Sequence, residues 1–305
     1  MIQHRGQFAT DPLGVYYDQL IPSAPTRHPT LMLIHGGGHT GSCWRMTADS
    51  RPGWADRFAA RGYPVLVPDW PGHGRSGAIE PDQVTGELLC QGLAGVIDRE
   101  DGPVVLITHS MGGALGWRLA EMRADRVIGI VALAPGPPGN IQPVASIEQM
   151  TDDEVWIRTP TRASRLRRRG LIRHDADFVV SKLVGDSMRF PRAALPFYAR
   201  MLTATAARLL FERQNAEASQ LRVTEPSCLG GKKILVLTGA HDLDHPRDID
   251  EPIVGWANAH GARAEYVWLP DHGIDGNGHM LMMEDNAEII ADLVLDWLDH
   301  AFAAR

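Results

Sequence analysis

Ser110 stands between an apolar stretch and a glycine-rich one, within VVLITHSMGGALGWRLAE at positions 104–121. This pattern predicts a strand that turns sharply into a helix, where a serine holds its hydroxyl exposed as a nucleophile. Such a turn is strained and needs small neighbours around the serine. Gly112 and Gly113 meet that need, whereas Thr108 replaces the first glycine of the G-x-S-x-G pattern. The alternative role for Ser110 is that of a helix N-cap.

Two later segments offer an acid and a base. The apolar run KKILVLT is followed by GAHDLDHP, in which Asp242 fits best as a carboxylate at the carboxyl end of a strand, with Asp244 as the alternative. A glycine-rich segment before the last helical pattern, LPDHGIDGNGHMLMMEDN, offers His279 as a base and His272 as its competitor. The chain order Ser110, Asp242, His279 is that of a serine-hydrolase triad on an α/β fold.

These three side chains predict nucleophilic attack on a carbonyl group. Neutral His279 would take the proton of Ser110 as it attacks a carbonyl and would return it to the leaving group, while Asp242 fixes the imidazole tautomer. The oxyanion needs preorganised donors, each worth about 3 to 4 kcal/mol. We expect the N–H of Met111 to be one donor, and that of Gly37 or Gly38, in the stretch LMLIHGGGHTGSCW, to be the other.

The same glycines allow a second interpretation. Gly36, Gly38 and Gly41 spell G-x-G-x-x-G after an apolar run, which is the fingerprint of a dinucleotide-binding turn, and Asp69 ends the next apolar run. Asp69 follows the glycines by about 30 residues instead of the usual ~20. The dinucleotide interpretation also leaves Ser110 without a role, so the oxyanion loop is favoured and no cofactor is expected.

HDLDH at positions 241–245, with His272 and Asp275 as companions, superficially resembles a metal-binding cluster. The spacing matches no standard zinc pattern, so no metal is expected.

The elements that must position these residues alternate along the chain. Short apolar runs with helical patterns between them predict repeated β-α units, and hence an α/β fold with a mainly parallel twisted sheet and helices on both faces. Two further runs near the N-terminus predict an antiparallel hairpin at the sheet edge. The predicted strands are 6–9, 15–21, 30–34, 64–68, 103–108, 127–133, 233–238 and 264–269.

The alternation stops between residues 136 and 226. PGPPGN and EPSCLGGKK mark the two ends of this stretch, and positions 194–213 repeat apolar residues at helical spacing. We therefore expect a core made of residues 1–135 and 227–305, with 136–226 inserted as a helical cap. The basic run at 162–169 is expected to be a solvated helix face.

Aromatic and methionine side chains near these turns could line a substrate pocket, although core packing is the alternative for each. The candidates are Trp44, Trp70, His109, Trp156, Phe197, Tyr198, Met201 and Met280.

Composition restricts the remaining classes. The chain has 305 residues, 44% of them hydrophobic, and a mild net charge of −7, which argues against nucleic acid as a partner. Three widely spaced cysteines are typical of free thiols in a reducing compartment. The first residues lack a signal pattern and no apolar run reaches about 18 residues. We expect a cytoplasmic protein that does not contact the membrane and acts on a small molecule. A homodimer is compatible with the sequence.

The motifs together resemble the α/β-hydrolase fold superfamily. HGGG, DWPGHGRSG, THSMGG, GAHDLDHP and GHMLMMED occur in order with fitting intervals, and HTGSCW with RPGWADRFAARGY is similar to a small branch of microbial esterases. The resemblance implies carboxylic ester hydrolysis beneath a helical cap, without a metal or organic cofactor. Some members of that branch take the acid from a glutamate after the strand that follows the nucleophile helix. Here LAPGPPGN places Ala134 there, so the acid must come from Asp242 or Asp244.

The resulting hypothesis is a serine hydrolase that cleaves a carboxylic ester or lactone through an acyl-enzyme. Acyl transfer or carbon–carbon bond hydrolysis with the same residues is the nearest alternative. A slow-turnover ligand receptor on the same fold is the alternative from another class.

Overall fold

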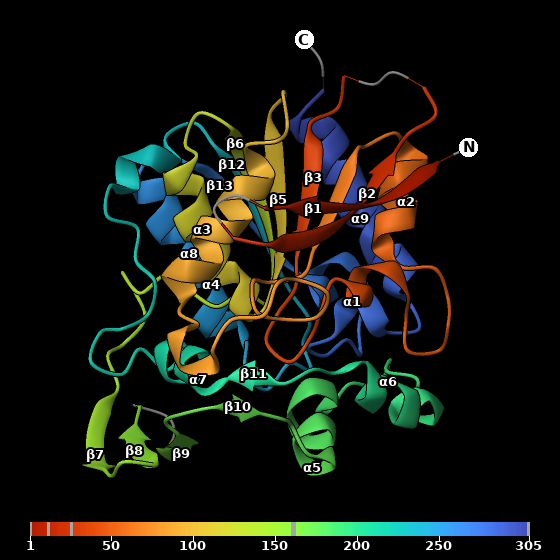
Figure 1. Ribbon diagram of the computed structural model, residues 1–305. Coiled ribbons are helices and arrows are strands. Elements are labelled where there is room, and N and C mark those ends of the chain that lie inside the picture. The colour runs from red at the N-terminus through yellow and green to blue at the C-terminus, as the bar shows by residue number, and fades with distance from the viewer. Residues whose placement is uncertain (1, 11–12, 25–26, 160–162, 304–305) are drawn as a thin grey trace.

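The computed structural model describes residues 2–10, 13–24, 27–159 and 163–303. Within these residues the central sheet has eight strands in the order β1-β2-β4-β3-β5-β6-β12-β13 (Figure 1). The pairs β1–β2 and β2–β4 are antiparallel and the others are parallel, as predicted. Positions 11 and 12 of the hairpin turn lie outside the described residues. The strands are β1 (Gln3–Ala9), β2 (Val15–Ile21), β3 (Thr30–Ile34), β4 (Val65–Pro68), β5 (Val104–His109), β6 (Val127–Leu133), β12 (Lys233–Thr238) and β13 (Arg263–Trp268).

The parallel strands at the centre of the sheet are buried on both faces, because helices cover each side. In Figure 1 one group of helices lies on one face and a second group on the other. The first group is α3 (Gly86–Ile97), α4 (Met111–Met122) and α8 (Arg247–Ala259), and the second is α1 (Ser42–Arg45), α2 (Trp54–Arg61) and α9 (Ala287–Ala301). Every residue of β3, β4 and β5 is buried.

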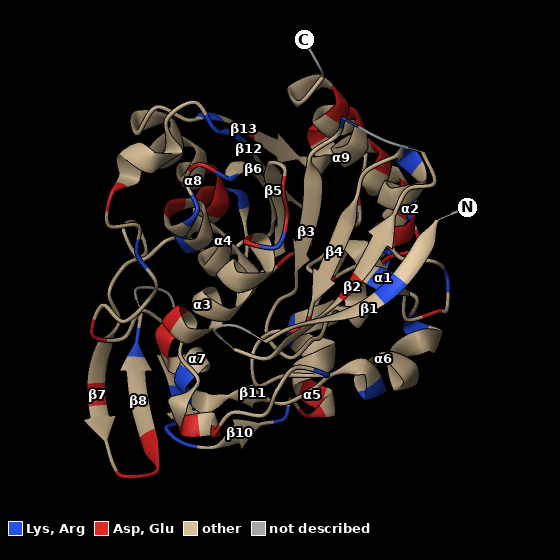
Figure 2. Ribbon diagram, turned by 45° about the horizontal axis from the view of Figure 1, so that its top comes forward, with Lys and Arg blue, Asp and Glu red and all other residues tan. Residues whose placement is uncertain are grey.

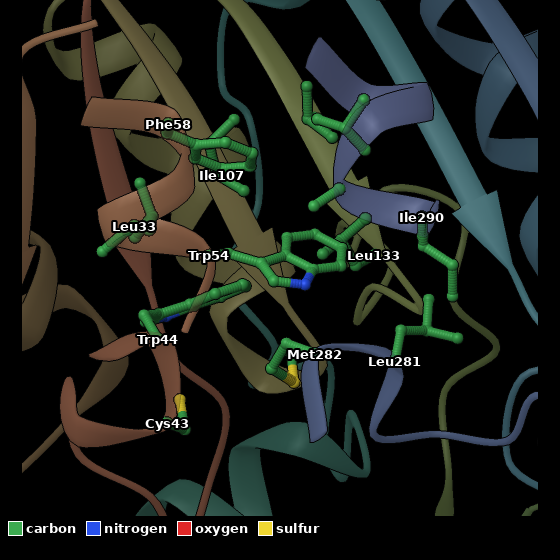
Figure 3. Close-up of a cluster of buried hydrophobic side chains, with 14 of the residues drawn as sticks. Leu33, Cys43, Trp44, Trp54, Phe58, Ile107, Leu133, Leu281, Met282 and Ile290 are labelled. Atoms are coloured by element: carbon green, nitrogen blue, oxygen red, sulfur yellow. The ribbon is translucent and has the colours of Figure 1, made fainter. Parts of the chain in front are cut away.

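The core beneath α2 and α9 is packed around large side chains. Figure 3 shows Trp44, Trp54 and Phe58 against Leu33 and Ile107, which project from β3 and β5. Figure 2 shows acidic residues on α9, and two of them hold α2 through arginine pairs. These pairs are Arg57–Asp292 and Arg61–Asp299, each with a shortest N–O distance of 2.5 Å.

The segment between β6 and β12 crosses the carboxyl ends of the strands (Figure 1). The prediction that residues 136–226 form a helical cap is wrong in part, because the segment also contains strands. Strands β7 (Ser146–Met150), β8 (Glu154–Arg158) and β9 (Ala163–Arg167) form an antiparallel sheet, and β10 (Leu171–Ile172) pairs with β11 (Thr205–Ala206). The helices are α5 (Ala176–Phe178), α6 (Leu195–Met201) and α7 (Ala207–Arg213), with a π-helical turn at Val179–Val184. We call this segment the cap.

Two local predictions within the cap also change. The helical pattern at 194–213 is broken into α6 and α7, with β11 between them. The described part of the basic run lies largely on the exposed strand β9, where Arg165 pairs with Glu154 of β8. Position 162 lies outside the described residues.

Short 3₁₀ turns complete the chain at Pro81–Gln83, Arg192–Ala194, Pro226–Leu229, Leu269–His272 and Leu281–Met283.

Candidate functional site

Ser110 lies at the tip of the turn between β5 and α4, with φ 52° and ψ −127°. This backbone conformation is costly for a residue with a side chain and is characteristic of strained functional turns. The turn packs tightly: a Cβ on Gly112 would lie 2.5 Å from the carbonyl oxygen of His35, and one on Gly113 would lie 2.5 Å from Cβ of Pro135. The small residues therefore let the turn approach its neighbours, as predicted.

Thr108 is tolerated in the turn because a glycine faces it. A Cβ on Gly116 of α4 would lie only 2.7 Å from Cγ2 of Thr108. The missing side chain at position 116 leaves room for the threonine methyl group where the usual pattern has glycine.

The structure brings Ser110, His279 and Asp242 into one hydrogen-bonded row. Nε2 of His279 lies 3.0 Å from Oγ of Ser110, and its Nδ1 lies 2.7 Å from Oδ2 of Asp242. All three residues are buried. Asp244, the alternative acid, instead pairs with Lys182 and Arg213 of the cap.

The carboxylate of Asp242 is prepared to stay ionised. Burial by itself raises its pKa, but the charges of His279 and His245 and the hydrogen bond from His279 outweigh burial and lower the pKa to about 2. Its second oxygen, Oδ1, accepts the backbone N–H groups of Asp244 and His245 at 3.0 and 3.2 Å. An ionised acceptor on Nδ1 fixes the imidazole tautomer in which Nε2 faces the serine.

The loop that carries His279 is held by a buried carboxylate. Glu284 accepts the backbone N–H of Gly278 at 2.7 Å and the side-chain N–H of Asn277 at 2.6 Å, and its other contact is the hydroxyl of Ser187 from the cap. His109 adds a further restraint, because its Nε2 lies 3.0 Å from the carbonyl oxygen of His279 and can only donate to it. These contacts fix the backbone on both sides of the imidazole.

The loop after β3 presents a free backbone donor beside the serine. A Cβ on Gly36 would lie 2.8 Å from Cβ of Ser110, and one on Gly37 would lie 2.4 Å from Sδ of Met111. Among the described residues, the N–H groups of Gly37 and Met111 have no hydrogen-bond partner. Gly38 is not available as the predicted oxyanion donor, because its N–H binds Oγ1 of Thr205 at 2.8 Å.

His35 and Asp69 hold this loop through hydrogen bonds to its backbone at Gly36 and Gly41. The backbone N–H of Trp70 reaches Nε2 of His35 at 3.2 Å, so Nδ1 of His35 carries the proton and donates to the carbonyl of Gly36 at 2.8 Å. Burial lowers the pKa of His35 to about 4, which keeps the ring neutral. Asp69, the residue that a dinucleotide site would use for the ribose, is instead buried against Arg75 and the N–H of Gly41.

A second histidine lies behind the row. The ring of His245 stacks on that of His279, with centroids 5.2 Å apart and an interplanar angle of 17°. Its Nδ1 lies 3.0 Å from Oδ1 of Asp250, and the hydroxyl of Thr238 donates to the other oxygen, Oδ2, of the same carboxylate. Burial lowers the pKa of His245, but the carboxylates of Asp250 and Asp242 outweigh burial and raise it to about 9.

The residues considered as an alternative base or as metal ligands do not join this hydrogen-bonded row. His272 is exposed on the 3₁₀ turn after β13. His241 and Asp275 approach only to 3.9 Å, and the described residues contain no group of three or more His, Cys, Asp or Glu side chains that could hold a metal ion.

The predicted pocket residues separate into groups. Trp44 and Met280 are fully buried in one hydrophobic cluster, and their role in a substrate pocket stays a prediction. Trp156 lies on β8, at the opposite end of the cap from α6 (Figure 1). Trp70 stacks on His35 and lines a cavity together with Met111.

Two of the remaining candidates lie at the row or the loop beside it. His109 contacts the base loop, and Tyr198 lies 2.9 Å from Nε2 of His39. Phe197 and Met201 are partly buried on α6, where their role in a pocket stays a prediction.

Sequence reasoning missed His39, Thr205, His245 and Glu284. His39 directly follows the three glycines and His245 lies in the acid loop, so both stood next to recognised motifs. Thr205 gave no signal, because its partner Gly38 is 167 positions away.

The site combines a serine on a strained turn, an imidazole held in one tautomer, and unpaired N–H groups beside them. These are the parts of a nucleophilic hydrolase site on an α/β sheet. The model of the alpha/beta hydrolase family matches residues 31–293, and the chain belongs to this family.

Relatives with assigned activities are distant. A probable secreted lipase from a fungus (Fungal sp. strain ATCC 74256) is 25% identical over 93% of this chain and 85% of its own length. The 2-hydroxy-6-oxononadienedioate/2-hydroxy-6-oxononatrienedioate hydrolase of Burkholderia vietnamiensis is 28% identical over 59% of this chain and 62% of its own length. A thermophilic esterase from Thermogutta terrifontis shares the fold with a TM-score of 0.62 and 19% identity, over 98% of this chain and 99% of that one. The relatives support hydrolase activity for this chain.

No helix in the described ranges is long and apolar enough to span a membrane.

Proposed function

We propose that the protein is a serine hydrolase that cleaves a carboxylic ester or lactone through an acyl-enzyme. The observation that carries this proposal is the row from Ser110 through His279 to Asp242, with distances of 3.0 and 2.7 Å and an ionised carboxylate at its end. No metal or organic cofactor takes part in the proposed steps.

In the first half-reaction, Nε2 of His279 takes the proton of Ser110 while Oγ forms a bond to the carbonyl carbon. The negative charge on the carbonyl oxygen is stabilised by the N–H groups of Gly37 and Met111, and by the positive N-terminal end of α4. The imidazolium then gives its proton to the departing alcohol, or to the ring oxygen of an opened lactone, and the acyl group stays on Ser110.

In the second half-reaction, water takes the place of the alcohol. His279 accepts a proton from the water as its oxygen attacks the acyl carbon, and the proton returns to Ser110 as the acid leaves. Asp242 remains ionised throughout and stabilises the imidazolium. Substitution of this carboxylate therefore tests tautomer control, whereas substitution of the serine tests the covalent step.

Carbon–carbon bond hydrolysis is the second candidate. The 28% identity to the 2-hydroxy-6-oxononadienedioate/2-hydroxy-6-oxononatrienedioate hydrolase supports it, because the substrate in that name carries hydroxyl, ketone and carboxylate groups but no ester bond. The two reactions use the same three side chains and differ in the group that leaves. Product analysis separates them, because an ester yields an alcohol and an acid whereas a carbon–carbon substrate yields a new C–H bond.

The first experiment is labelling with a fluorophosphonate probe, followed by peptide mass spectrometry. We expect an adduct on Ser110 in the wild type, no adduct in Ser110→Ala, and unchanged labelling in Ser227→Ala, which removes an exposed serine. Ser110→Ala should also abolish ester hydrolysis while its circular dichroism spectrum matches the wild type. Ester turnover retained by Ser110→Ala would contradict the mechanism.

We further propose that the protein acts in a reducing compartment such as the cytoplasm. All three cysteines are free, and Cys43 and Cys90 are buried. Immunodetection of the native protein in cell fractions tests this proposal, and recovery from the culture medium would contradict it.

A further inference from the structure

The cap makes two hydrogen bonds to a single residue of the loop beside the nucleophile. Oγ1 of Thr205 accepts the N–H of Gly38 at 2.8 Å, and the N–H of Thr203 donates to the carbonyl of Gly38, also at 2.8 Å. Thr205 is fully buried. Both backbone groups of Gly38 are therefore bound by the cap and not by the core.

A third cap residue reaches the same loop through His39. Nδ1 of His39 lies 2.9 Å from the carbonyl oxygen of Gly37, so it must carry a proton and donate. Burial lowers the pKa of His39 to about 3, so the ring is neutral and Nε2 is an acceptor. The hydroxyl of Tyr198, 2.9 Å away on α6, therefore donates to Nε2.

These contacts hold one peptide unit at both edges. The C=O and N–H of a trans peptide point in opposite directions, so the carbonyl of Gly37 bound by His39 and the N–H of Gly38 bound by Thr205 fix the plane between Gly37 and Gly38. The preceding plane carries the N–H of Gly37, and His35 holds it through the carbonyl of Gly36.

The two planes meet at Gly37, whose dihedral angles are less restricted than those of other residue types because it has no Cβ. The core restrains one side of this joint and the cap restrains the other. Without the cap, the Gly37–Gly38 plane loses the hydrogen bond at its N–H and the donor that orients His39. The direction of the Gly37 N–H would then rest on His35 alone.

We propose that Thr205 and Tyr198 are positioning residues for transition-state stabilisation, and that docking of the cap onto residues 36–39 completes the oxyanion hole. The nucleophile, the base, the acid and the Met111 donor all lie on the core, and the cap touches the base loop only indirectly, through Ser187 and Glu284. The Gly37 donor differs, because the peptide unit next to it is bound by the cap directly. This inference rests on the proposed function, since it assigns a role within that mechanism.

The test compares Thr205→Val, which removes the acceptor at nearly constant volume, with Thr205→Ser, which keeps the hydroxyl. Steady-state hydrolysis of p-nitrophenyl butyrate gives kcat and KM for both and for the wild type. Misplacement of a catalytic group by about 1 Å costs on the order of a hundredfold. We expect Thr205→Val to lower kcat by about ten- to a hundredfold with KM within about twofold, and Thr205→Ser to stay near the wild type.

A second readout separates oxyanion stabilisation from a merely structural effect. A trifluoromethyl ketone adds to the active serine as a tetrahedral adduct whose oxygen occupies the oxyanion hole. Its inhibition constant should rise in Thr205→Val by the same factor by which kcat/KM falls, because both report the same donor. Butyrate, a product that forms no such adduct, should bind Thr205→Val as it binds the wild type.

Tyr198→Phe covers the case in which Thr205→Val does not fold, because it removes a single hydroxyl and leaves the ring packed. We expect a smaller loss of kcat with the same proportional loss of ketone affinity. Wild-type kcat in a folded Thr205→Val or Tyr198→Phe protein would overturn the proposal, as would an equal loss in Thr205→Ser. A wild-type protein that neither takes the fluorophosphonate nor hydrolyses the ester would instead overturn the proposed function itself.

Discussion

Two aspartates only two positions apart perform different tasks in the loop after β12. Oδ2 of Asp242 binds the imidazole of His279, whereas Asp244 pairs with Lys182 and Arg213 of the cap. The acid of the row is therefore specified by the direction in which the turn points each side chain. Either carboxylate was compatible with the sequence.

We predict that Asp242→Asn lowers kcat by about ten-thousandfold, because the amide permits the wrong imidazole tautomer. Asp244→Asn serves as the matched control, since it alters an ion pair in the same loop without contact to the imidazole. Its kcat should stay within about tenfold of the wild type, in line with the modest worth of a partly exposed pair. A larger loss in Asp244→Asn than in Asp242→Asn would reverse the assignment.

His245 gives the protein a pH-dependent stability in the neutral to alkaline range. Its pKa is raised to about 9 in the folded chain by Asp250 and Asp242, with Arg213 acting in the opposite sense, whereas an unfolded histidine titrates near ~6.5. The stabilisation is full below about pH 6.5 and is lost as the pH rises through about 9. Its size is on the order of a few kcal/mol.

We predict that the wild-type melting temperature falls between pH 7 and pH 9.5, and that His245→Asn flattens this decline. Thermal denaturation followed by circular dichroism across that range measures the effect. His300→Asn, at an exposed position on α9, should retain the wild-type slope. A parallel decline in His245→Asn and the wild type would show that the stacked imidazole is not charged.

The nucleophile could be predicted from the sequence because its signal is local. The strand, the turn and the glycines around Ser110 are contiguous in the sequence, so one short stretch shows all the features of a nucleophile turn. The restraint on Gly38 could not be predicted, because Thr205 lies on the cap and meets it only after the chain has folded. Which of two adjacent glycines keeps a free N–H is decided by that distant contact.

At the scale of elements, β5 and α4 pack closely because a larger residue on the strand faces a glycine on the helix. The threonine at position 108 occupies space that the absent side chain of Gly116 leaves open. We predict that Gly116→Ala lowers the free energy of unfolding by about 1 to 3 kcal/mol through overpacking. Thr108→Ala should restore most of this loss in the double variant, because the clashing methyl group is gone.

Urea denaturation of the two single variants and the double variant gives the coupling energy between the positions. Additive losses would mean that α4 shifts along β5 to accommodate the methyl group, and that the two positions do not share one space.

The strands of the sheet were predictable, whereas those of the cap were not. β3, β5 and β12 are apolar runs bounded by turn residues, and helices cover both of their faces. β7 and β9 are exposed along most of their length and contain no apolar run. Their pairing rests on backbone hydrogen bonds and on Val155 and Ile157 of β8, a signal too short to distinguish from a loop.

On the scale of the whole molecule, the sheet of β7, β8 and β9 has a small hydrophobic cluster of its own. Within the described residues its buried cluster consists of Ala145, Val155, Ile157 and Ala216, apart from the two large clusters of the core. Regions with few buried apolar contacts open at lower free energy than the core does.

We predict that amides of β7–β9 exchange with deuterium much faster than those of β5, β6 and β12. Hydrogen exchange followed by mass spectrometry of proteolytic fragments measures this, and the fragment that contains β11 should be protected more than β7–β9 because Thr205 is anchored to the core. Equal protection of β7–β9 and the central strands would contradict the prediction.

The cap leaves the sheet after β6 and returns at β12, and these two strands are neighbours that pair in parallel. Its two ends therefore lie side by side, so a segment of almost any length can be inserted at this point without disturbing the order of the strands. In evolutionary terms, the cap can be replaced as a unit while the nucleophile, base and acid of the core stay unchanged. A new cap would still have to supply a hydrogen-bond partner for Gly38, and a contact for Glu284 such as Ser187 provides here.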